Sequence, residues 1–358
     1  MAKLPISVCI IAKNEEKYME QCLQHLITYG MEIVVVDTGS IDRTKEIALK
    51  YTDKVYDFAW INDFSAARNF AASKAKNNWI LVVDCDEYLK ELDMQAIRIC
   101  MQKHLHHVGL IKIKNVHTQS NGEQTYQIDE VPRLYNRNFF EYRFRIHEQI
   151  TPQKADLNGK VVLYSFQVPA MVEHHGYDLP QDEMLLKQER NLKLLQSALG
   201  ENAYDDYLYF QIAQSYYILH QYEEAAEAIE HCFEMEPDVG KGYMKIAIPI
   251  YAKIMRKVKR SKDALKHLLK YEQAIRTAEF SYLLGCCYQE CGENLKALLT
   301  FIKITQMPDI DTLGEDAYDV YVRIIMLHSM SGNQEGVVFF EQRLEEYGLS
   351  HGRKIVFQ

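Results

Sequence analysis

Short apolar runs alternate with amphipathic segments in the N-terminal part of the chain. The apolar runs predict strands at residues 6–12, 32–36, 55–58 and 79–83. Between them, apolar positions recur at helical spacing and predict helices over residues 15–27, 43–51 and 64–76. Strands that alternate with helices are typical of a parallel sheet covered by helices, so this part is expected to form an α/β domain.

The pattern changes to that of β structure between about residues 105 and 175. Residues 108–116 alternate apolar and polar side chains, as a half-buried strand does. Asn121-Gly122 is a hairpin-turn signal, and residues 161–164 predict a further strand. Residues 181–199 then carry leucines at helical spacing and predict an amphipathic helix.

From residue 204 onward the pattern is helical and repetitive. Ala225 and Ala297 occupy matching positions in two units that each end near a proline, Pro237 and Pro308. The two alanines lie about two 34-residue tetratricopeptide periods apart. Such units must stack to bury their apolar faces, which predicts a curved solenoid with a concave binding face. The unit around Ala264 is degenerate, so an irregular helical bundle remains the alternative interpretation.

These patterns predict three segments: an α/β domain over residues 1–180, a connecting helix over 181–203 and an all-α repeat domain over 204–358. The length of 358 residues agrees with more than one domain. The net charge of −9 argues against nucleic acid or an anionic membrane as the main partner. No apolar stretch approaches the ~20 residues of a membrane-spanning helix, and the chain enters a strand-like run with no signal-peptide pattern.

The eight cysteines are scattered without the spacing of metal ligands. Several of them sit in apolar periodic segments, where a thiol behaves as a small core residue. We therefore expect reduced cysteines in a cytoplasmic protein.

Asp84-Cys85-Asp86 follows directly on the strand predicted at residues 79–83. Two carboxylates at the end of a buried strand are costly unless a cation or hydrogen-bond donors compensate them. In an open α/β sheet, ligands bind at the carboxyl ends of the strands. Mg²⁺ bridging these carboxylates to a diphosphate explains both features, although the triplet alone also fits a solvated turn.

Two other predicted strands end in polar loops. Asp37 follows the second strand and precedes Gly39 and Ser40, while Asn14-Glu15 follows the first strand. Each of these loops alone fits an ordinary, well-capped strand-to-helix connection. Arg68, on the helix predicted at 64–76, alone fits a surface charge. Because the carboxyl ends of parallel strands share one edge, the three loops at 12–15, 37–42 and 84–88 are expected to form one site.

Taken together, four segments resemble the family 2 nucleotide-sugar glycosyltransferases, which have the GT-A fold with its Rossmann-like mixed sheet. The segments are residues 11–16, 36–44, 60–69 and 79–87, and the resemblance covers roughly residues 5–180. It implies that Asn14, Glu15 and Asp37 hold the nucleoside of a UDP-sugar, and that Asp84 and Asp86 bind Mg²⁺ or Mn²⁺ on its diphosphate. The donor-binding residues expected from it are Ala12, Asn14, Glu15, Asp37, Ser40, Arg68, Asp84 and Cys85.

The same resemblance suggests residues for the remaining tasks. The segment 145–148 is similar to a basic-x-His-Glu segment of the subgroup, which implies Glu148 as general base and His147 as the second candidate; a Glu in a surface turn is the alternative. His174, before a Gly-Tyr pair, corresponds to a strand-end His that completes the metal shell in related enzymes. Lys187 and Arg190 resemble cationic diphosphate contacts, or they form the solvated face of their helix.

A narrower resemblance comes from the pairing of such a domain with tetratricopeptide-like repeats. That arrangement is similar to the peptide S-glycosyltransferases that modify glycocin bacteriocins. The resemblance implies an inverting transfer from a UDP-sugar to a Cys thiol of a precursor peptide, with repeats that contribute to peptide binding and dimerisation. Two alternatives stay open: an enzyme that acts on a glycan or lipopolysaccharide-core acceptor, and a catalytically inactive repeat scaffold.

Overall fold

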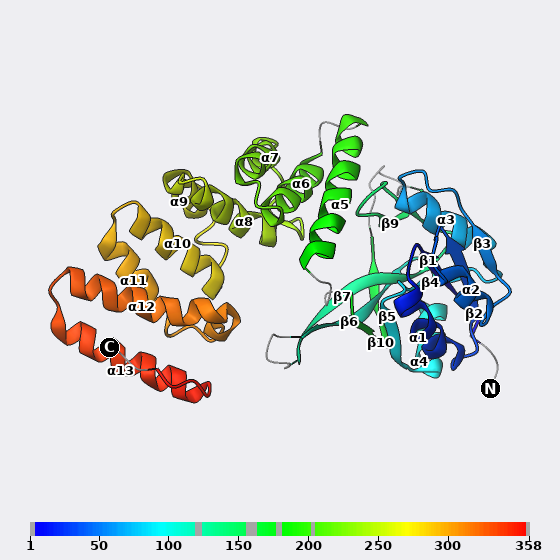
Figure 1. The fold of residues 1–358 in the computed structure, drawn as a ribbon, viewed down its shortest axis with the longest axis horizontal. Coiled ribbons are helices and arrows are strands. Elements are labelled where there is room, and N and C mark those ends of the chain that lie inside the picture. Colours follow the sequence, from blue (N-terminus) through cyan, green and yellow to red (C-terminus); the bar gives the residue numbers. More distant parts are fainter. Residues whose placement is uncertain (1–3, 119–123, 155–162, 177–180, 202–204, 356–358) are drawn as a thin grey trace. The chain divides into compact units, whose positions relative to one another are not determined.

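The computed structural model describes residues 4–118, 124–154, 163–176, 181–201 and 205–355 (Figure 1). The chain divides into two compact units, residues 1–187 and 188–358. The division falls within helix α5 (Gln181–Glu201), the segment that was expected to connect the two domains.

The N-terminal unit is built on a mixed sheet of eight strands in the order β3-β2-β1-β4-β7-β6-β10-β5. The strands β1 to β4 pair in parallel, and β7 pairs antiparallel with both β4 and β6. A separate hairpin pairs β8 with β9. The strands are β1 (Ile6–Ala12), β2 (Glu32–Asp37), β3 (Val55–Asp57), β4 (Trp79–Val82), β5 (Glu87–Leu92), β6 (Val108–Thr118), β7 (Gln124–Asn136), β8 (Phe140–Arg143), β9 (Gln149–Pro152) and β10 (Ser165–His174).

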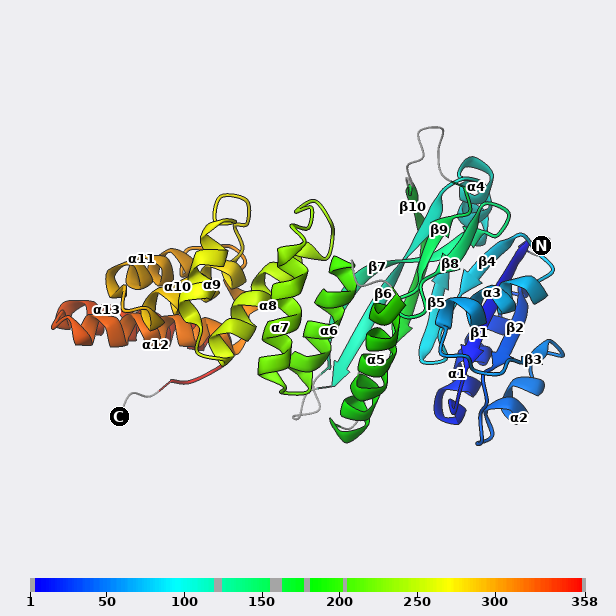
Figure 2. The same ribbon diagram turned by 90° about the horizontal axis from the view of Figure 1, so that it is seen from above.

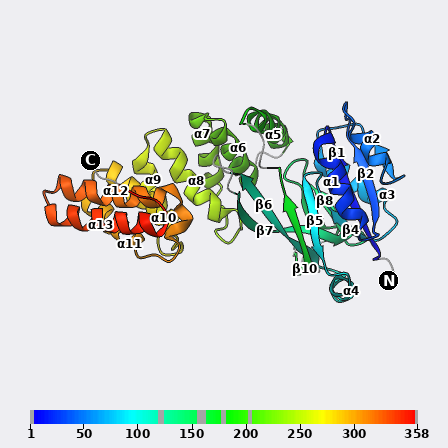
Figure 3. The same ribbon diagram turned by 60° about the horizontal axis from the view of Figure 1, so that its bottom comes forward.

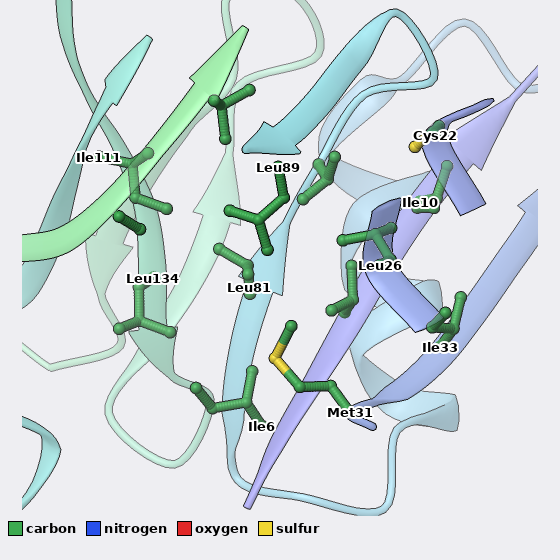
Figure 4. Close-up of a cluster of buried hydrophobic side chains, with 14 of the residues drawn as sticks. Ile6, Ile10, Cys22, Leu26, Met31, Ile33, Leu81, Leu89, Ile111 and Leu134 are labelled. Carbon is green, nitrogen blue, oxygen red and sulfur yellow. The ribbon is translucent and has the colours of Figure 1, made fainter. Parts of the chain in front are cut away.

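The two faces of this sheet are covered differently. Successive strand residues point to opposite faces, so Ile6, Val8 and Ile10 bury one face while Cys9 lies on the other. The first face packs against α1 (Glu16–Ile27), α2 (Thr44–Leu49) and α4 (Met94–Lys103), as the buried side chains of Figure 4 illustrate for α1. The second face packs against α3 (Phe64–Lys74) and the β8–β9 hairpin.

The predicted strands and helices of residues 6–83 are confirmed, with ends that differ by a residue or two. The strand predicted at residues 161–164 is wrong in position: residues 163 and 164 precede β10, and residues 161 and 162 lie outside the described part. The Asn121-Gly122 turn also lies outside it, although β6 and β7 on either side pair antiparallel. The sequence patterns missed β5, which follows Asp86 directly, and α4 after it.

The helical unit consists of antiparallel helix pairs, and Figures 2 and 3 show α6 beside α7 and α12 beside α13. Small residues set these contacts, since Ala225, Ala264 and Ala297 are fully buried. A Cβ on Gly285 would lie 2.6 Å from the Phe301 ring, so α10 and α11 approach where only glycine fits. The helices are α6 (Asp206–Ile218), α7 (Tyr222–Glu234), α8 (Met244–Lys257), α9 (Ser261–Leu269), α10 (Ala278–Glu290), α11 (Asn294–Ile304), α12 (Glu315–Met330) and α13 (Gln334–Ser350).

This arrangement confirms the expected fold class, an α/β GT-A-type mixed-sheet domain followed by helical repeats. The degenerate unit around Ala264 forms the regular pair α8–α9. Within the described residues, no helix combines the length and apolar character needed to span a bilayer. All eight cysteines are free thiols, and six of them are buried.

Candidate functional site

The loops after β1 and β2 are tied together by side-chain hydrogen bonds. The amide of Asn14 donates to the Ser40 hydroxyl at 2.9 Å, and the Asn14 side-chain oxygen accepts from the amide of Ile41 at 2.9 Å. Asn14 has φ = +56°, a left-handed conformation that Asn tolerates better than most residues. The carbonyl of Ala12 accepts from the Thr38 amide at 2.9 Å, next to the paired positions Ala12 and Asp37. Asn14 and Ser40 therefore hold the loops after β1 and β2 together at the edge of the sheet.

Asp37 ends β2 with its side chain buried at 4% exposure. Its Oδ1 accepts from the amides of Gly39 and Ser40, both at 2.7 Å. Its Oδ2 is buried and has no hydrogen-bond partner among the described residues. A buried acceptor without a partner costs free energy, and an N–H or hydroxyl donor of a ligand would remove that cost.

Asp84 follows β4 and is held by two arginines. Arg68 Nη2 donates to one carboxylate oxygen at 3.0 Å, and Arg133 Nη2 donates to the other at 2.8 Å. Burial alone would raise the pKa of Asp84, but the charges of Arg133 and Arg68 outweigh burial and hold the pKa well below its usual range. Asp84 is therefore ionised at neutral pH.

The two arginines join Asp84 to further carboxylates. Arg68 Nε donates to Glu148 at 2.6 Å, and Arg133 Nη2 donates to Glu87 at 2.5 Å. Arg68 reaches these groups from α3, whose start is capped by Asp63 accepting from the amide of Ala66. Arg68 Nη1 and Arg133 Nε remain buried without a partner in the described part of the chain. Two unused guanidinium donors beside a carboxylate network form a place where an anion would bind.

Arg133 and Glu87 were not among the residues expected from the sequence. Arg133 lies on β7, 49 residues from Asp84, and no local motif surrounds it. Glu87 directly follows Asp86, yet it is buried at 3% exposure and accepts the amide of Asp84 at 2.9 Å. Its position beside the Asp-x-Asp triplet is the one sequence signal that pointed to it.

Asp86 faces away from the arginines, toward His174 at the end of β10. The His174 Nε2 lies 3.4 Å from Asp86 Oδ2, and its Nδ1 lies 2.9 Å from the Asn115 side-chain oxygen. Burial lowers the pKa of His174, but the hydrogen bond and charge of Asp86 raise it above the ordinary value. A Cβ on Gly176 would lie 2.1 Å from Asp86 Oδ2, so glycine leaves room for this pair. His175 lies apart, with its ring against Tyr88.

The described residues contain no group of three or more His, Cys, Asp or Glu side chains arranged to hold a metal ion. The three residues expected as metal ligands divide into two groups, because Asp84 is bound to arginines while Asp86 pairs with His174. A carboxylate and an imidazole side by side suit Mn²⁺ and similar divalent ions. Asp86 and His174 would thus supply two ligands of suitable type to a divalent cation, whereas both carboxylate oxygens of Asp84 are paired with arginines.

Glu15 belongs to the same acidic edge. Burial and the charge of Asp86 raise its pKa to about 7, and Lys187 opposes that shift. Lys187 thus acts on this edge electrostatically, whereas Arg190 belongs to the helical unit. Cys85 is a packed thiol whose Sγ lies 3.8 Å from the carbonyl of Ile11, and burial raises its pKa well above the usual value.

The candidate base segment lies between β8 and β9. Glu148 is bound to Arg68, and its side chain is 14% exposed, so it is not a surface-turn residue. His147 has φ = +51°, and burial lowers the pKa of its imidazole despite the nearby charge of Glu148. Arg68 therefore links the carboxylate expected on the acceptor side to the carboxylate expected on the donor side.

Comparisons with known proteins agree with this geometry. Residues 7–158 match the model of the family Glycosyl transferase family 2. A TPR repeat-containing protein of Synechococcus elongatus is 29% identical over 214 residues, which cover 58% of this chain and 51% of that protein. The glycosyltransferase SunS of Bacillus subtilis is 24% identical over 230 residues, 63% of this chain and 53% of SunS. The chain spans about half the length of these curated relatives.

Among solved structures, YrrB, a TPR protein with an unusual peptide-binding site, aligns with a TM-score of 0.40 at 18% identity. That alignment covers 46% of this chain and 79% of YrrB. The family match spans strands β1 to β9 of the described sheet and hairpin, including both arginines and the whole Asp84 network. Residues 7–158, which lie within the N-terminal unit, are therefore similar to the glycosyl transferase family 2.

Proposed function

We propose that this protein is a glycosyltransferase that moves a sugar from a UDP-sugar to a peptide acceptor. The observation that carries the proposal is the set of buried polar atoms without partners at one sheet edge. Within the described residues, Asp37 Oδ2 is an unused acceptor, while Arg68 Nη1 and Arg133 Nε are unused donors. A nucleoside diphosphate offers N–H and hydroxyl donors at one end and anionic oxygens at the other, so it complements both kinds of atom.

The spacing of these atoms along the sheet supports the same ligand. Asp37 ends β2 and Asp84 follows β4, with β1 paired between them. Neighbouring strands are about 4.8 Å apart, which puts the two carboxylates about 10 Å apart across the edge. A nucleoside held at Asp37 therefore extends its diphosphate toward the arginines at Asp84.

The chain's own residues then have distinct tasks. Arg68 and Arg133 bind diphosphate oxygens, and their charges stabilise the nucleoside diphosphate as it leaves. A divalent cation held by Asp86 and His174, joined by Asp84, would neutralise the remaining charge of the leaving group. Because the cation favours ionised carboxylates, it would also lower the raised pKa of Glu15.

On the acceptor side, Glu148 is the proposed general base, with His147 as the second candidate. The attacking group must lose a proton, and the ion pair with Arg68 fixes the position of the Glu148 carboxylate that would accept it. Burial lowers the pKa of His147, which favours the neutral imidazole, the form that can accept a proton. A single displacement on this geometry inverts the anomeric carbon.

We propose a Cys thiol of a bacteriocin precursor as the acceptor. The pKa of an unperturbed thiol is about 8.5, far below that of a hydroxyl, so a carboxylate or imidazole base is sufficient. The repeat pairs α6–α13 supply a surface on which a peptide can be held. An acceptor sugar on a glycan or lipopolysaccharide core is the second candidate, since the donor site is the same for both.

The test is mass spectrometry of Cys-containing and Ser-substituted peptides incubated with UDP-sugars, Mn²⁺ and the full chain. We expect a hexose-type adduct on the Cys peptide and none on its Ser counterpart. Adducts on glycan acceptors alone would replace the peptide proposal with the second candidate. Calorimetric absence of UDP binding in the presence of Mn²⁺ would contradict the glycosyltransferase proposal and support an inactive scaffold.

A further inference from the structure

Helix α9 and the residues on either side of it carry four exposed lysines without ion-pair partners among the described residues. These are Lys259, Lys262, Lys266 and Lys270, which we call the α9 lysine face. Their neighbours differ: Arg256 is bound to Glu290, and Arg260 is bound to Glu230 through two hydrogen bonds of 2.9 and 2.7 Å. The lysines thus form a positively charged cluster on a chain whose net charge is −9.

The spacing of these lysines carries an energetic cost. Lys262, Lys266 and Lys270 follow one another at i, i+4 and i+8, so they lie along the same side of the helix. Like charges at i, i+4 destabilise a helix. An anionic partner removes this repulsion, whereas solvent and salt only screen it.

A hollow of about 620 Å³ runs beside this face, between α9 and the turn that joins α10 to α11. The same three lysines line it together with Leu265 and Leu269, and Leu269 is 43% exposed. The acidic residue in this lining, Glu293, is already paired with Lys296 at 2.5 Å. The hollow therefore combines an apolar floor with a positive rim.

A second hollow of about 260 Å³ shares Lys266 and Lys270 with the first. Its wall includes His267, which is 6% exposed and stacks on Tyr251 with ring centroids 3.9 Å apart. The His267 Nε2 is buried and has no hydrogen-bond partner in the described part of the chain. Glu230, Glu234 and Asp263 also line this second hollow, so the positive rim belongs to the first hollow.

We propose that the α9 lysine face is a docking surface for an acidic peptide segment with interspersed apolar residues. Carboxylates of the peptide pair with the rim lysines, and apolar side chains cover Leu265 and Leu269. The described lining of the first hollow has leucines and no aromatic side chain on which bases would stack, which favours a peptide over nucleic acid there. The proposal does not depend on sugar transfer, because it concerns binding to the helical unit alone.

The experiment measures fluorescence anisotropy of a labelled peptide with the full chain and no sugar donor. The peptide contains Glu throughout, with Leu at i, i+4 positions. We expect the triple variant Lys262→Glu, Lys266→Glu, Lys270→Glu to bind about tenfold more weakly, since three ion pairs are lost and replaced by repulsion. The triple Lys→Gln variant, which removes charge without reversing it, is expected to fall between that variant and the parent.

The matched control reverses three exposed lysines elsewhere in the same unit, Lys245, Lys303 and Lys354, with an identical change in net charge. We expect this control to change the affinity by less than about twofold. An equal loss in the control would overturn the proposal, because binding would then depend on net charge alone. Equal or tighter binding of a single-stranded oligonucleotide, or no binding of the peptide by the parent protein, would also overturn it.

Discussion

The two units of this protein treat charged side chains in opposite ways. At the sheet edge of the N-terminal unit, Arg68 and Arg133 are largely buried, and each keeps one donor unpartnered by the described residues. In the helical unit, Arg256 is partly exposed and Arg260 is exposed, and both are paired with acidic side chains. The buried atoms without partners that the structure shows in the helical unit belong to Tyr243, His267 and His328, not to arginines or carboxylates.

The two units therefore use buried polar and apolar contacts in different ways. The helical unit is held by small residues at helix contacts, as Ala225 and Gly285 illustrate, and its ion pairs are peripheral. The N-terminal unit keeps a buried ion network around Asp84 at the sheet edge proposed to bind the donor. Buried ion pairs contribute little net stability, so a network of this kind indicates binding more than folding.

The largest effect on stability is expected from removing Arg133, whose partner Glu87 is buried. Arg133→Ala leaves Glu87 buried at 3% exposure with its partner gone and should lower the free energy of unfolding of the N-terminal unit by about 3–5 kcal/mol. Arg256→Ala, at a partly exposed pair, should cost about 1 kcal/mol or less. Urea unfolding of both variants measures the contrast. Equal losses would show that the two units do not differ as described.

The next largest effect is expected on the rate of sugar transfer when the charge of Asp84 is removed. Asp84→Asn keeps the size of the side chain but removes the charge that Arg68 and Arg133 hold in place. We expect sugar transfer, measured as UDP release with an acceptor peptide, to fall about a hundredfold. Asp53→Asn, an exposed position in the same unit, serves as the control and should leave transfer unchanged. Full activity of the Asp84 variant would contradict the proposed role of this carboxylate in the donor site.

Much of the fold follows from local patterns. The strands β1, β2 and β4 are continuous apolar runs, and the polar residues Asn14, Asp37 and Asp84 stand at their ends, so sequence analysis found them. Ala225 and Ala297 similarly mark helix contacts through their spacing. These features depend on neighbours in sequence, which is why periodicity reveals them.

The rest depends on contacts that sequence spacing does not encode. The strand β5 is Glu-Tyr-Leu-Lys-Glu-Leu, and its first residue is buried only because Arg133 of β7 pairs with it. The strand β10 contains Pro169, which disfavours a strand in sequence, and it has a register irregularity between Met171 and Val172, although its burial alternates over residues 165–172. The division of the expected ligands between arginines and His174 likewise emerges only in three dimensions.

A third variant tests the small-residue contacts of the helical unit. Gly285→Ala places a Cβ 2.6 Å from the Phe301 ring and should destabilise that unit by about 1–3 kcal/mol without affecting nucleotide binding. Gly242→Ala is the matched control, since no atom lies within 4 Å of a Cβ there, and it should change stability by about 0.5 kcal/mol at most. Thermal unfolding together with UDP calorimetry separates the two readouts. Weakened UDP binding by the Gly285 variant would contradict the prediction that packing in the helical unit does not affect nucleotide binding.

The smallest effect concerns pH and His267. Burial, with a further contribution from Lys270, lowers the pKa of His267 from 6.5 to about 3 in the folded state. Because the folded pKa is depressed, the stabilisation is complete above pH 6.5 and is lost progressively as the pH falls toward 3. The unfolded chain takes up a proton in that window while the folded unit does not. At about pH 5.5 the loss from this residue alone should be about 1.4 kcal/mol.

His267→Phe keeps the aromatic contacts with Phe233 and Tyr251 but has no group to titrate. Its urea-unfolding free energy should fall less than that of the parent between about pH 7.5 and pH 5.5, by about 1.4 kcal/mol. Taking the difference between the two proteins cancels the other titratable groups that line the same hollow, among them Glu230, Glu234 and Asp263. Parallel pH profiles would mean that His267 is as easily protonated in the folded unit as in water. In that case burial would not perturb His267, and the contrast between this histidine and the buried ion network of the sheet edge would be lost.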